Sequence, residues 1–523
     1  MNNSPSSVAI SGQKHSGLNG EQLASRAFIG WVFILLALDL LTLRWFPVPW
    51  NDEALFADPA ASLLLHGHWT STVWYGRGDF AYWGGNMPAY SFLLVPWMWL
   101  WGVSAPAMRS LNCVLIALTL VCTWFSVKRL NLIPSPKIRL AILFALSLGY
   151  PVSYCVRCGR PDVLGMLLFS VGAFFWTSPK RSAACVGLFV CMVLLPFTGL
   201  QYAFYLPALL GLLLWAGGKP VYSRLGAIIA GGCLGAILIL AYYQFFAGWD
   251  GLLANMSDIR SRLPSGFWSR FQALMTRQIF VYYFGRPHFL LLIAAAALLG
   301  AAWKHLTRAS RQLLWYGLIM LLVPGIVIGL FCHFGAPYHW LTAAPAMILF
   351  AAAAARSWEN LGGKTRLAGC LLVLGLAVSG RIMFVLMGWG ADVAGYTDRV
   401  AQAATAIVQP GEDVFIDPQV YFALKPRAGR IYTPEIVARL TPQEKAAVSV
   451  AFLTPDEEYG YAWFTNSFAG HWIQLADFPA PPCQAKTSAG VSRLLKWFHA
   501  GYFIGHPLAV YRRYPVMPEA AAR

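Results

Sequence analysis

Charged residues are scarce in this sequence: Asp, Glu, Lys and Arg make up only 12% of its 523 residues, whereas 58% are hydrophobic. A soluble protein needs far more polar surface to cover its apolar side chains, so this composition excludes a soluble protein and predicts an integral membrane protein. The sequence also lacks a small-residue cleavage site after its first apolar run, residues 27–43. This run is therefore predicted to be an uncleaved signal anchor that follows a polar cytoplasmic segment, residues 1–26.

Nucleotide-binding motifs are also missing. Gly363-Lys364-Thr365 resembles the end of a phosphate loop, but Trp358 stands where the first glycine of that motif belongs, and no Gly-x-Gly-x-x-Gly follows a strand. These absences argue against a nucleotide sugar as a direct donor. The polar tail holds a single cysteine, Cys483, so it encodes no disulfide framework. The net charge of +17 is explained by basic cytoplasmic loops, and no nucleic acid is predicted as a partner.

Long apolar runs recur through the first 389 residues, and roughly 20 such residues form a helix that crosses a bilayer. The runs predicted to cross are residues 27–45, 106–127, 139–156, 163–177, 182–198, 203–216, 224–247, 287–303, 312–331, 341–355 and 366–389. The run 88–101 is shorter and carries Trp97, Trp99 and Trp101, which favours a helix lying in the membrane interface. The predicted fold class is a polytopic α-helical membrane protein with about eleven transmembrane helices.

The positions of the basic residues predict which side of the membrane each loop lies on. With the amino terminus inside, about eleven crossings place each basic loop cluster on the cytoplasmic side, as the positive-inside rule requires. The clusters contain Lys128, Arg129, Lys137, Arg139, Lys180, Arg181, Lys219, Arg224, Lys304, Arg308, Arg311, Lys364 and Arg366. The segments then predicted to lie outside are the first loop 46–105, the turn 157–162, the loop 249–286, the turn 332–340 and the tail after residue 390.

The tail, residues 390–523, has ordinary polar content and differs from the transmembrane region 27–389. Residues 394–408 have the pattern of a helix. Strand-like runs occupy residues 414–416, 448–453, 472–475 and 508–511. The tail is therefore predicted to form a small α/β domain on the outer side of the membrane.

Two short segments that should emerge on the outer face carry acidic and basic side chains. Asp52 and Glu53 follow the first apolar run, and ionisable residues beside a membrane are costly and often functional. The second outer turn reads Arg157-Cys158-Gly159-Arg160-Pro161-Asp162. These residues are the first candidates for a catalytic centre at a membrane surface. The alternatives are a solvated loop for Asp52 and Glu53, and a helix cap for Asp162.

At this point the sequence resembles a family, the polytopic GT-C glycosyltransferases that include protein O-mannosyltransferases and lipid A aminoarabinose transferases. The pattern Ala-x-x-Leu-Leu-x-Gly that ends at Gly67 and the Asn86-Met87-Pro88 entry to the interfacial helix belong to the resemblance. So do the Asp-Glu pair, the Arg-Pro-Asp turn and Tyr338 before the helix with Pro345. The resemblance implies a GT-C-like transmembrane domain and a polyprenyl-phosphate sugar as the donor.

Chemistry agrees with this resemblance. An acceptor hydroxyl needs a carboxylate base near neutral pH, whereas a phosphate leaving group needs no general acid. Asp52 is therefore assigned as the general base of an inverting transfer, and Glu53 as a catalytic residue that orients the acceptor or a metal. The departing lipid phosphate needs cations, and arginine suits phosphate oxygens. The predicted substrate-binding residues are Arg157, Arg160, Asp162, Arg270, Arg277, Tyr338 and His339.

A divalent metal is a further prediction, with Glu53, Asp162 and His333 as its ligands. Neither His333 nor His339 has a zinc-type spacing, so the ligands of such a metal would come from separate loops. The arginine-rich loop 249–286 suits an anionic ligand, or alternatively anionic lipid headgroups. Arg270 is its first candidate.

The leading functional prediction is a glycosyltransferase of a bacterial inner membrane whose active site faces the periplasm. Its partners would be the donor, membrane lipids and an acceptor that the sequence leaves open as glycan, lipid or protein. The alternatives are a flippase for lipid-linked sugars and a non-catalytic scaffold whose outer tail binds a partner. The absence of an internal repeat disfavours a transporter.

Overall fold

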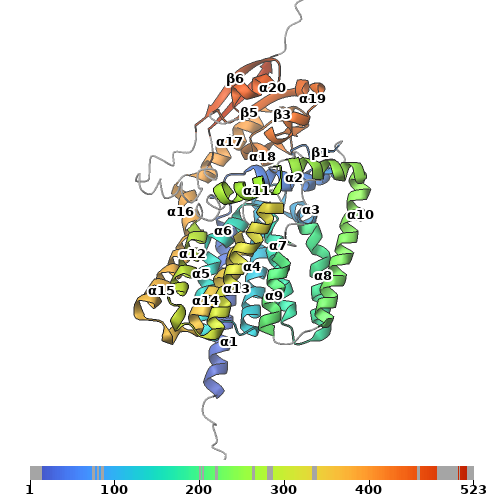
Figure 1. The fold of residues 1–523 in the computed structure, drawn as a ribbon. Coiled ribbons are helices and arrows are strands. Elements are labelled where there is room, and N and C mark those ends of the chain that lie inside the picture. Colours follow the sequence, from blue (N-terminus) through green and yellow to red (C-terminus); the bar gives the residue numbers. More distant parts are fainter. Residues whose placement is uncertain are drawn as a thin grey trace, which may run out of the picture.

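The computed structural model describes residues 14–73, 77–78, 82–83, 88–199, 202, 205–217, 222–261, 265–278, 287–331, 339–390, 392–455, 460–479, 505 and 507–514. Figure 1 shows a bundle of helices with a small sheet packed over one end of it. The start of helix α1 lies at the opposite end. The first loop, with helices α2 and α3, lies between the bundle and the sheet.

Four helices of the described chain are long and apolar enough to cross a membrane. They are Gly20–Leu41 within α1 (Lys14–Leu41), α4 (Ala105–Arg129), α8 (Arg181–Thr198) and Tyr222–Phe246 within α10 (Tyr222–Ser261). Two bent pairs raise this number to six: α5 (Pro136–Leu148) with α6 (Tyr150–Arg157), and α15 (Gly363–Val378) with α16 (Arg381–Gly390). The protein is therefore an integral membrane protein, as predicted, and the count of eleven crossings stays a prediction.

Shorter apolar helices complete the bundle. They are α7 (Asp162–Trp176), α9 (Leu206–Gly217), α12 (Pro287–Ala301) and α14 (His339–Arg356), and the longer α13 (Arg308–Phe331) packs against α14. The described part of the predicted outer loop 249–286 is helical, because a second helical segment of α10 runs from the non-helical Gly248 to Ser261. Gly248 has a φ of 67°, which a glycine adopts without strain, so the helix turns there. α11 (Phe267–Ala273) and a π-helical turn (Leu274–Gln278) follow.

The described part of the first loop contains two helices and a short pair of strands. α2 (Asn51–His66) ends at Gly67, whose φ of 73° gives the helix a left-handed cap. The short antiparallel strands β1 (Arg77–Gly78) and β2 (Tyr82–Trp83) lead to α3 (Ala89–Trp101). Trp99 and Trp101 of α3 are exposed, in keeping with the prediction of a helix in the membrane interface.

The tail begins with α17 (Val393–Ile407) and forms a mixed sheet in the order β4-β3-β5-β7-β6. Strands β3 (Asp413–Phe415), β4 (Ile431–Tyr432) and β5 (Val448–Leu453) are parallel, whereas β6 (His471–Phe478) and β7 (Leu508–Tyr514) join antiparallel to their neighbours. Helices α18 (Tyr421–Leu424), α19 (Pro442–Ala447) and α20 (Tyr461–Ser467) lie between the strands in the chain. The predicted helix and all four predicted strand runs of the tail are present.

Candidate functional site

Asp52 and Glu53 lie in the first turn of α2. Carboxylates are favourable there, because the unpaired backbone N–H groups give a helix start a partial positive charge. The two side chains differ in exposure: 25% of the Asp52 side chain is accessible, whereas Glu53 is completely buried. The pair is therefore not the solvated loop considered as an alternative, and only Asp52 is open to a reactant.

Arg160 joins Asp52 to Asp162. Its Nη1 donates to Asp52 Oδ2, and its Nε donates to Asp162 Oδ2 at 2.6 Å. The other Asp162 oxygen accepts from the Tyr202 hydroxyl at 3.1 Å. The N-cap of α7 is Pro161 and makes no side-chain cap, so Asp162 does not have the capping role considered for it. The two acidic segments predicted to meet therefore do meet, through a shared arginine.

Glu53 forms a separate ion pair with Arg109 of α4. Arg109 Nε and Nη2 donate to the two carboxylate oxygens, each at 2.6 Å, and its Nη1 donates to the carbonyl oxygens of Leu43 and Pro47. Gly159 lies against this pair with a φ of 49°, and a Cβ there would be 2.7 Å from Glu53 Cγ. This geometry favours a positioning role for Glu53, which anchors α2 to α4. The predicted catalytic and metal-binding role of Glu53 stays a prediction.

Burial raises the pKa of the Asp52 carboxyl above its usual value, because lost hydration penalises the charged form. The positive charge of Arg160 opposes this shift, and the negative charge of Asp162 adds to it. A carboxylate with a raised pKa is a stronger base than an exposed aspartate. The local environment therefore suits Asp52 to accept a proton.

Arg157 belongs to a different cluster, in the interior of the bundle. Its Nη1 donates to the Thr42 carbonyl oxygen at 2.8 Å, and its Nη2 lies 3.5 Å from Asp39 Oδ1. Arg381, at the start of α16, donates to both Asp39 oxygens. Arg157 is 1% exposed, so the geometry favours a structural role that links α6 to α1. Its predicted contact with substrate stays a prediction.

A third buried ion pair fastens the tail to α2. Lys425 Nζ lies 2.7 Å from Asp58 Oδ1 and donates to Ser62 Oγ at 2.9 Å. The Tyr421 hydroxyl also donates to Asp58 Oδ1 at 2.7 Å, and the Thr72 N–H donates to Oδ2 at 3.1 Å. The tail thus holds α2, the helix whose first turn contains Asp52. Sequence reasoning did not assign these residues, although Asp58 stands out as a charge on an otherwise apolar stretch.

The remaining predicted residues are placed in part. Arg270 lies in α11 at the same end of the bundle, and its Nη1 donates to the Leu330 carbonyl oxygen at 3.5 Å. Arg277 lies in the π-helical turn and His339 starts α14, but the side chains of both fall outside the described residues. Tyr338 and His333 lie wholly outside the described residues.

The predicted divalent metal has no ligand set among the residues that the structure describes. No group of three or more His, Cys, Asp or Glu side chains in that part of the chain is close enough to hold an ion. Glu53 and Asp162 are each engaged by an arginine. The metal therefore stays a prediction that depends on residues outside the described ranges.

A cavity is present at the junction between the helix bundle and the tail. It has a volume of about 510 Å³, with Trp101 and Arg109 on the bundle side and Asp398 and Phe422 on the tail side. Arg109 separates this cavity from Glu53. Asp52, Arg160 and Asp162 do not line this cavity, so the site combines a shared Asp-Arg-Asp cluster with a tail that fixes α2.

Two solved structures share this arrangement of helices and tail. ArnT from Cupriavidus metallidurans bound to undecaprenyl phosphate matches with a TM-score of 0.51 and 14% identity, over 94% of this chain and 99% of that one. The apo state of ArnT from Cupriavidus metallidurans matches with a TM-score of 0.53 and 14% identity, over 92% of this chain and 98% of that one. This protein has the GT-C fold. No protein-family model and no curated protein matches the chain.

The fold confirms the resemblance that the sequence motifs indicated. ArnT is a lipid A aminoarabinose transferase with a GT-C fold. At 14% identity the likeness concerns the path of the chain, so it assigns no substrate and no residue role to this protein.

Proposed function

We propose that this protein is a glycosyltransferase that moves a sugar from a polyprenyl-phosphate donor to an acceptor at the outer face of the membrane. The observation that carries the proposal is the Asp52-Arg160-Asp162 cluster at the tail end of a GT-C bundle. ArnT, which has the same fold, was solved with undecaprenyl phosphate bound. We assign the outer face to the periplasmic side of a bacterial inner membrane, from the positions of the basic loops.

In this proposal Asp52 accepts the proton of the acceptor hydroxyl. The acceptor oxygen then forms a bond to the anomeric carbon while the bond from that carbon to the phosphate oxygen breaks. The bonding electrons leave with the lipid phosphate, and the single displacement inverts the anomeric centre. Arg160 holds Asp52 in place, and Arg270 and Arg277 are the candidates that neutralise the charge developing on the phosphate.

The test compares Asp52→Asn with wild type and with Asp250→Asn, an exposed position in α10. Each purified protein is incubated with a panel of polyprenyl-phosphate sugars and a membrane extract that contains acceptors, and mass spectrometry measures the released polyprenyl phosphate. Loss of a general base lowers a rate by roughly 10² to 10⁴. We expect that loss for Asp52→Asn, with unchanged binding of undecaprenyl phosphate, and no change for Asp250→Asn.

Full activity of Asp52→Asn would reject Asp52 as the base. A wild-type protein that moves sugar lipids across vesicles without transferring any sugar would reject the enzyme and favour a flippase.

A further inference from the structure

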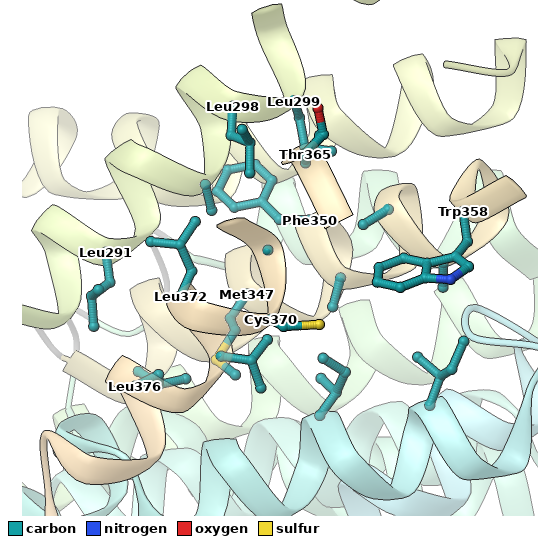
Figure 2. Close-up of a pocket in the computed structure, with 18 of the residues that line it drawn as sticks. Leu291, Leu298, Leu299, Met347, Phe350, Trp358, Thr365, Cys370, Leu372 and Leu376 are labelled. Atoms are coloured by element: carbon teal, nitrogen blue, oxygen red, sulfur yellow. The ribbon is translucent and has the colours of Figure 1, made fainter. Parts of the chain in front are cut away.

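An apolar cavity of about 430 Å³ lies between α5, α12, α14 and α15. Figure 2 shows leucines, Phe350 and Met347 pointing into it, with Trp358 at one end and Leu291 and Leu376 at the other. None of its described lining residues is charged. Its volume falls in the range of roughly 300–1,000 Å³ that small-molecule sites occupy. The cavity can therefore hold a ligand, but only an apolar one.

The length of the cavity matches one leaflet of a bilayer. Its lining follows α15 from Thr365 to Leu376. Eleven residues of α-helix rise about 16 Å. Half of the hydrocarbon core of a bilayer is about 15 Å thick. The cavity thus has the length of an extended lipid chain within a single leaflet.

The cavity reaches the end of the bundle that is remote from the sheet. Its lining there includes Ile138 in the first turn of α5, Ala355 in the last turn of α14, and Thr365 in the first turn of α15. These turns lie at the lower end of the bundle in Figure 1, whereas α2 lies at the other end. The cavity is therefore separate from the Asp52 cluster.

Exposed cations flank this end of the cavity. Lys137 precedes the lining residue Ile138, and Lys364 precedes the lining residue Thr365. Both lysines are exposed, and the acidic residue nearby in the chain is Glu359. Cations beside one end of an apolar cavity favour a ligand with an apolar chain and an anionic head.

We propose that this cavity binds one acyl chain of an anionic phospholipid, with the lipid phosphate held by Lys137 and Lys364. The binding site is distinct from the donor site, because it lies at the opposite end of the bundle. Its occupant comes from the leaflet on the side of the amino terminus.

The native cysteines of the chain provide a direct test. Cys370 lines the cavity and is exposed, whereas Cys233 is exposed in α10 and does not line it. The delipidated full-length protein in detergent is labelled with a maleimide, and peptide mass spectrometry gives the rate at each cysteine. The probes are phosphatidylglycerol, phosphatidylcholine and undecaprenyl phosphate, added in equal amounts. We expect phosphatidylglycerol to slow labelling of Cys370 at least tenfold and to leave Cys233 unchanged.

Charge variants separate the headgroup from the chain. Lys137→Glu with Lys364→Glu should remove the protection of Cys370 by phosphatidylglycerol, and the folding of the protein should be unaffected because both lysines are exposed. Lys180→Glu, an exposed lysine before α8, is the matched control and should keep the protection. Equal protection by phosphatidylcholine, or no protection by phosphatidylglycerol, would overturn the proposal. Stronger protection by undecaprenyl phosphate would also overturn it and assign the cavity to the donor chain.

Discussion

Replacing Lys425 by methionine removes the cation that neutralises Asp58 at the junction of the tail and α2. The lysine and the aspartate are both buried, and Nζ lies 2.7 Å from Oδ1. In the Lys425→Met variant the donors to the Asp58 carboxylate that remain among the described residues are the neutral Tyr421 and Thr72. Methionine fills a similar volume, so the main effect is an uncompensated buried charge.

Breaking a buried ion pair in this way costs about 3–5 kcal/mol. The two remaining hydrogen bonds place the expected cost at the lower end, about 3 kcal/mol. Each 1.4 kcal/mol is about tenfold in an equilibrium constant, so the population of open α2 should rise about a hundredfold. Asp58→Asn in the same chain removes the uncompensated charge and keeps an acceptor for Tyr421. The double variant should therefore recover at least about 1 kcal/mol.

Hydrogen exchange measured by mass spectrometry on α2 peptides of the full chain reports this opening directly. The control is Arg399→Met, which breaks the exposed pair between Arg399 and Asp392, with side chains 61% and 56% accessible. Exposed pairs contribute about 0–1 kcal/mol, so exchange in α2 should match wild type. Wild-type exchange in Lys425→Met would refute the reasoning, and so would a double variant as unprotected as the single one.

Three further predictions concern the Asp52 site. The transfer rate should fall with decreasing pH as Asp52 takes up a proton, at a pH above the usual aspartate pKa of about 4. Arg160→Gln should move this acidic limb of the pH–rate profile to higher pH, because Arg160 lowers the pKa of Asp52. An acidic limb that does not move would contradict the assignment of Asp52 as the base. Arg109→Met should destabilise the protein by about 3–5 kcal/mol, seen as a lower melting temperature, and Glu53→Gln in the same chain should restore part of it. Gly159→Ala should lower the rate of transfer, because the new Cβ would contact Glu53 and because a positive φ costs an L-residue about 1–2 kcal/mol. A transfer rate equal to that of wild type would argue against this crowding.

Much of the architecture follows from local pattern. Apolar runs predict the helices, alternation predicts strands such as β5 and β7, and the order of short motifs predicts the GT-C fold. The meeting of Asp52 with Asp162 also follows, because the predicted topology places both segments on one side. The apolar span of α10 ends at Phe246, which agrees with a predicted outer segment from residue 249, but the helical structure of that segment after the kink at Gly248 was not predicted.

The buried ion pairs are harder to predict, because each joins residues that are far apart in the chain. Arg109 is the single charged residue of α4 before its last turn, and its partner Glu53 belongs to another helix. The signal is nevertheless present: a charge within an apolar helix is costly and needs a partner. The signal does not say which partner, since that depends on how the helices pack. For the same reason the sequence did not predict that Arg157 lies beside Asp39.

The docking of the tail on α2 also has a consequence for biosynthesis. Asp58 and Tyr421 are 363 positions apart, so the ribosome makes the aspartate long before its partners. At about 5–20 residues per second, this interval is roughly 20–70 s. During that time the Asp58 carboxylate has the Thr72 N–H as a donor but neither Tyr421 nor Lys425. The contacts that fix α2 to the tail are therefore complete only when the last part of the polypeptide has been made and folded.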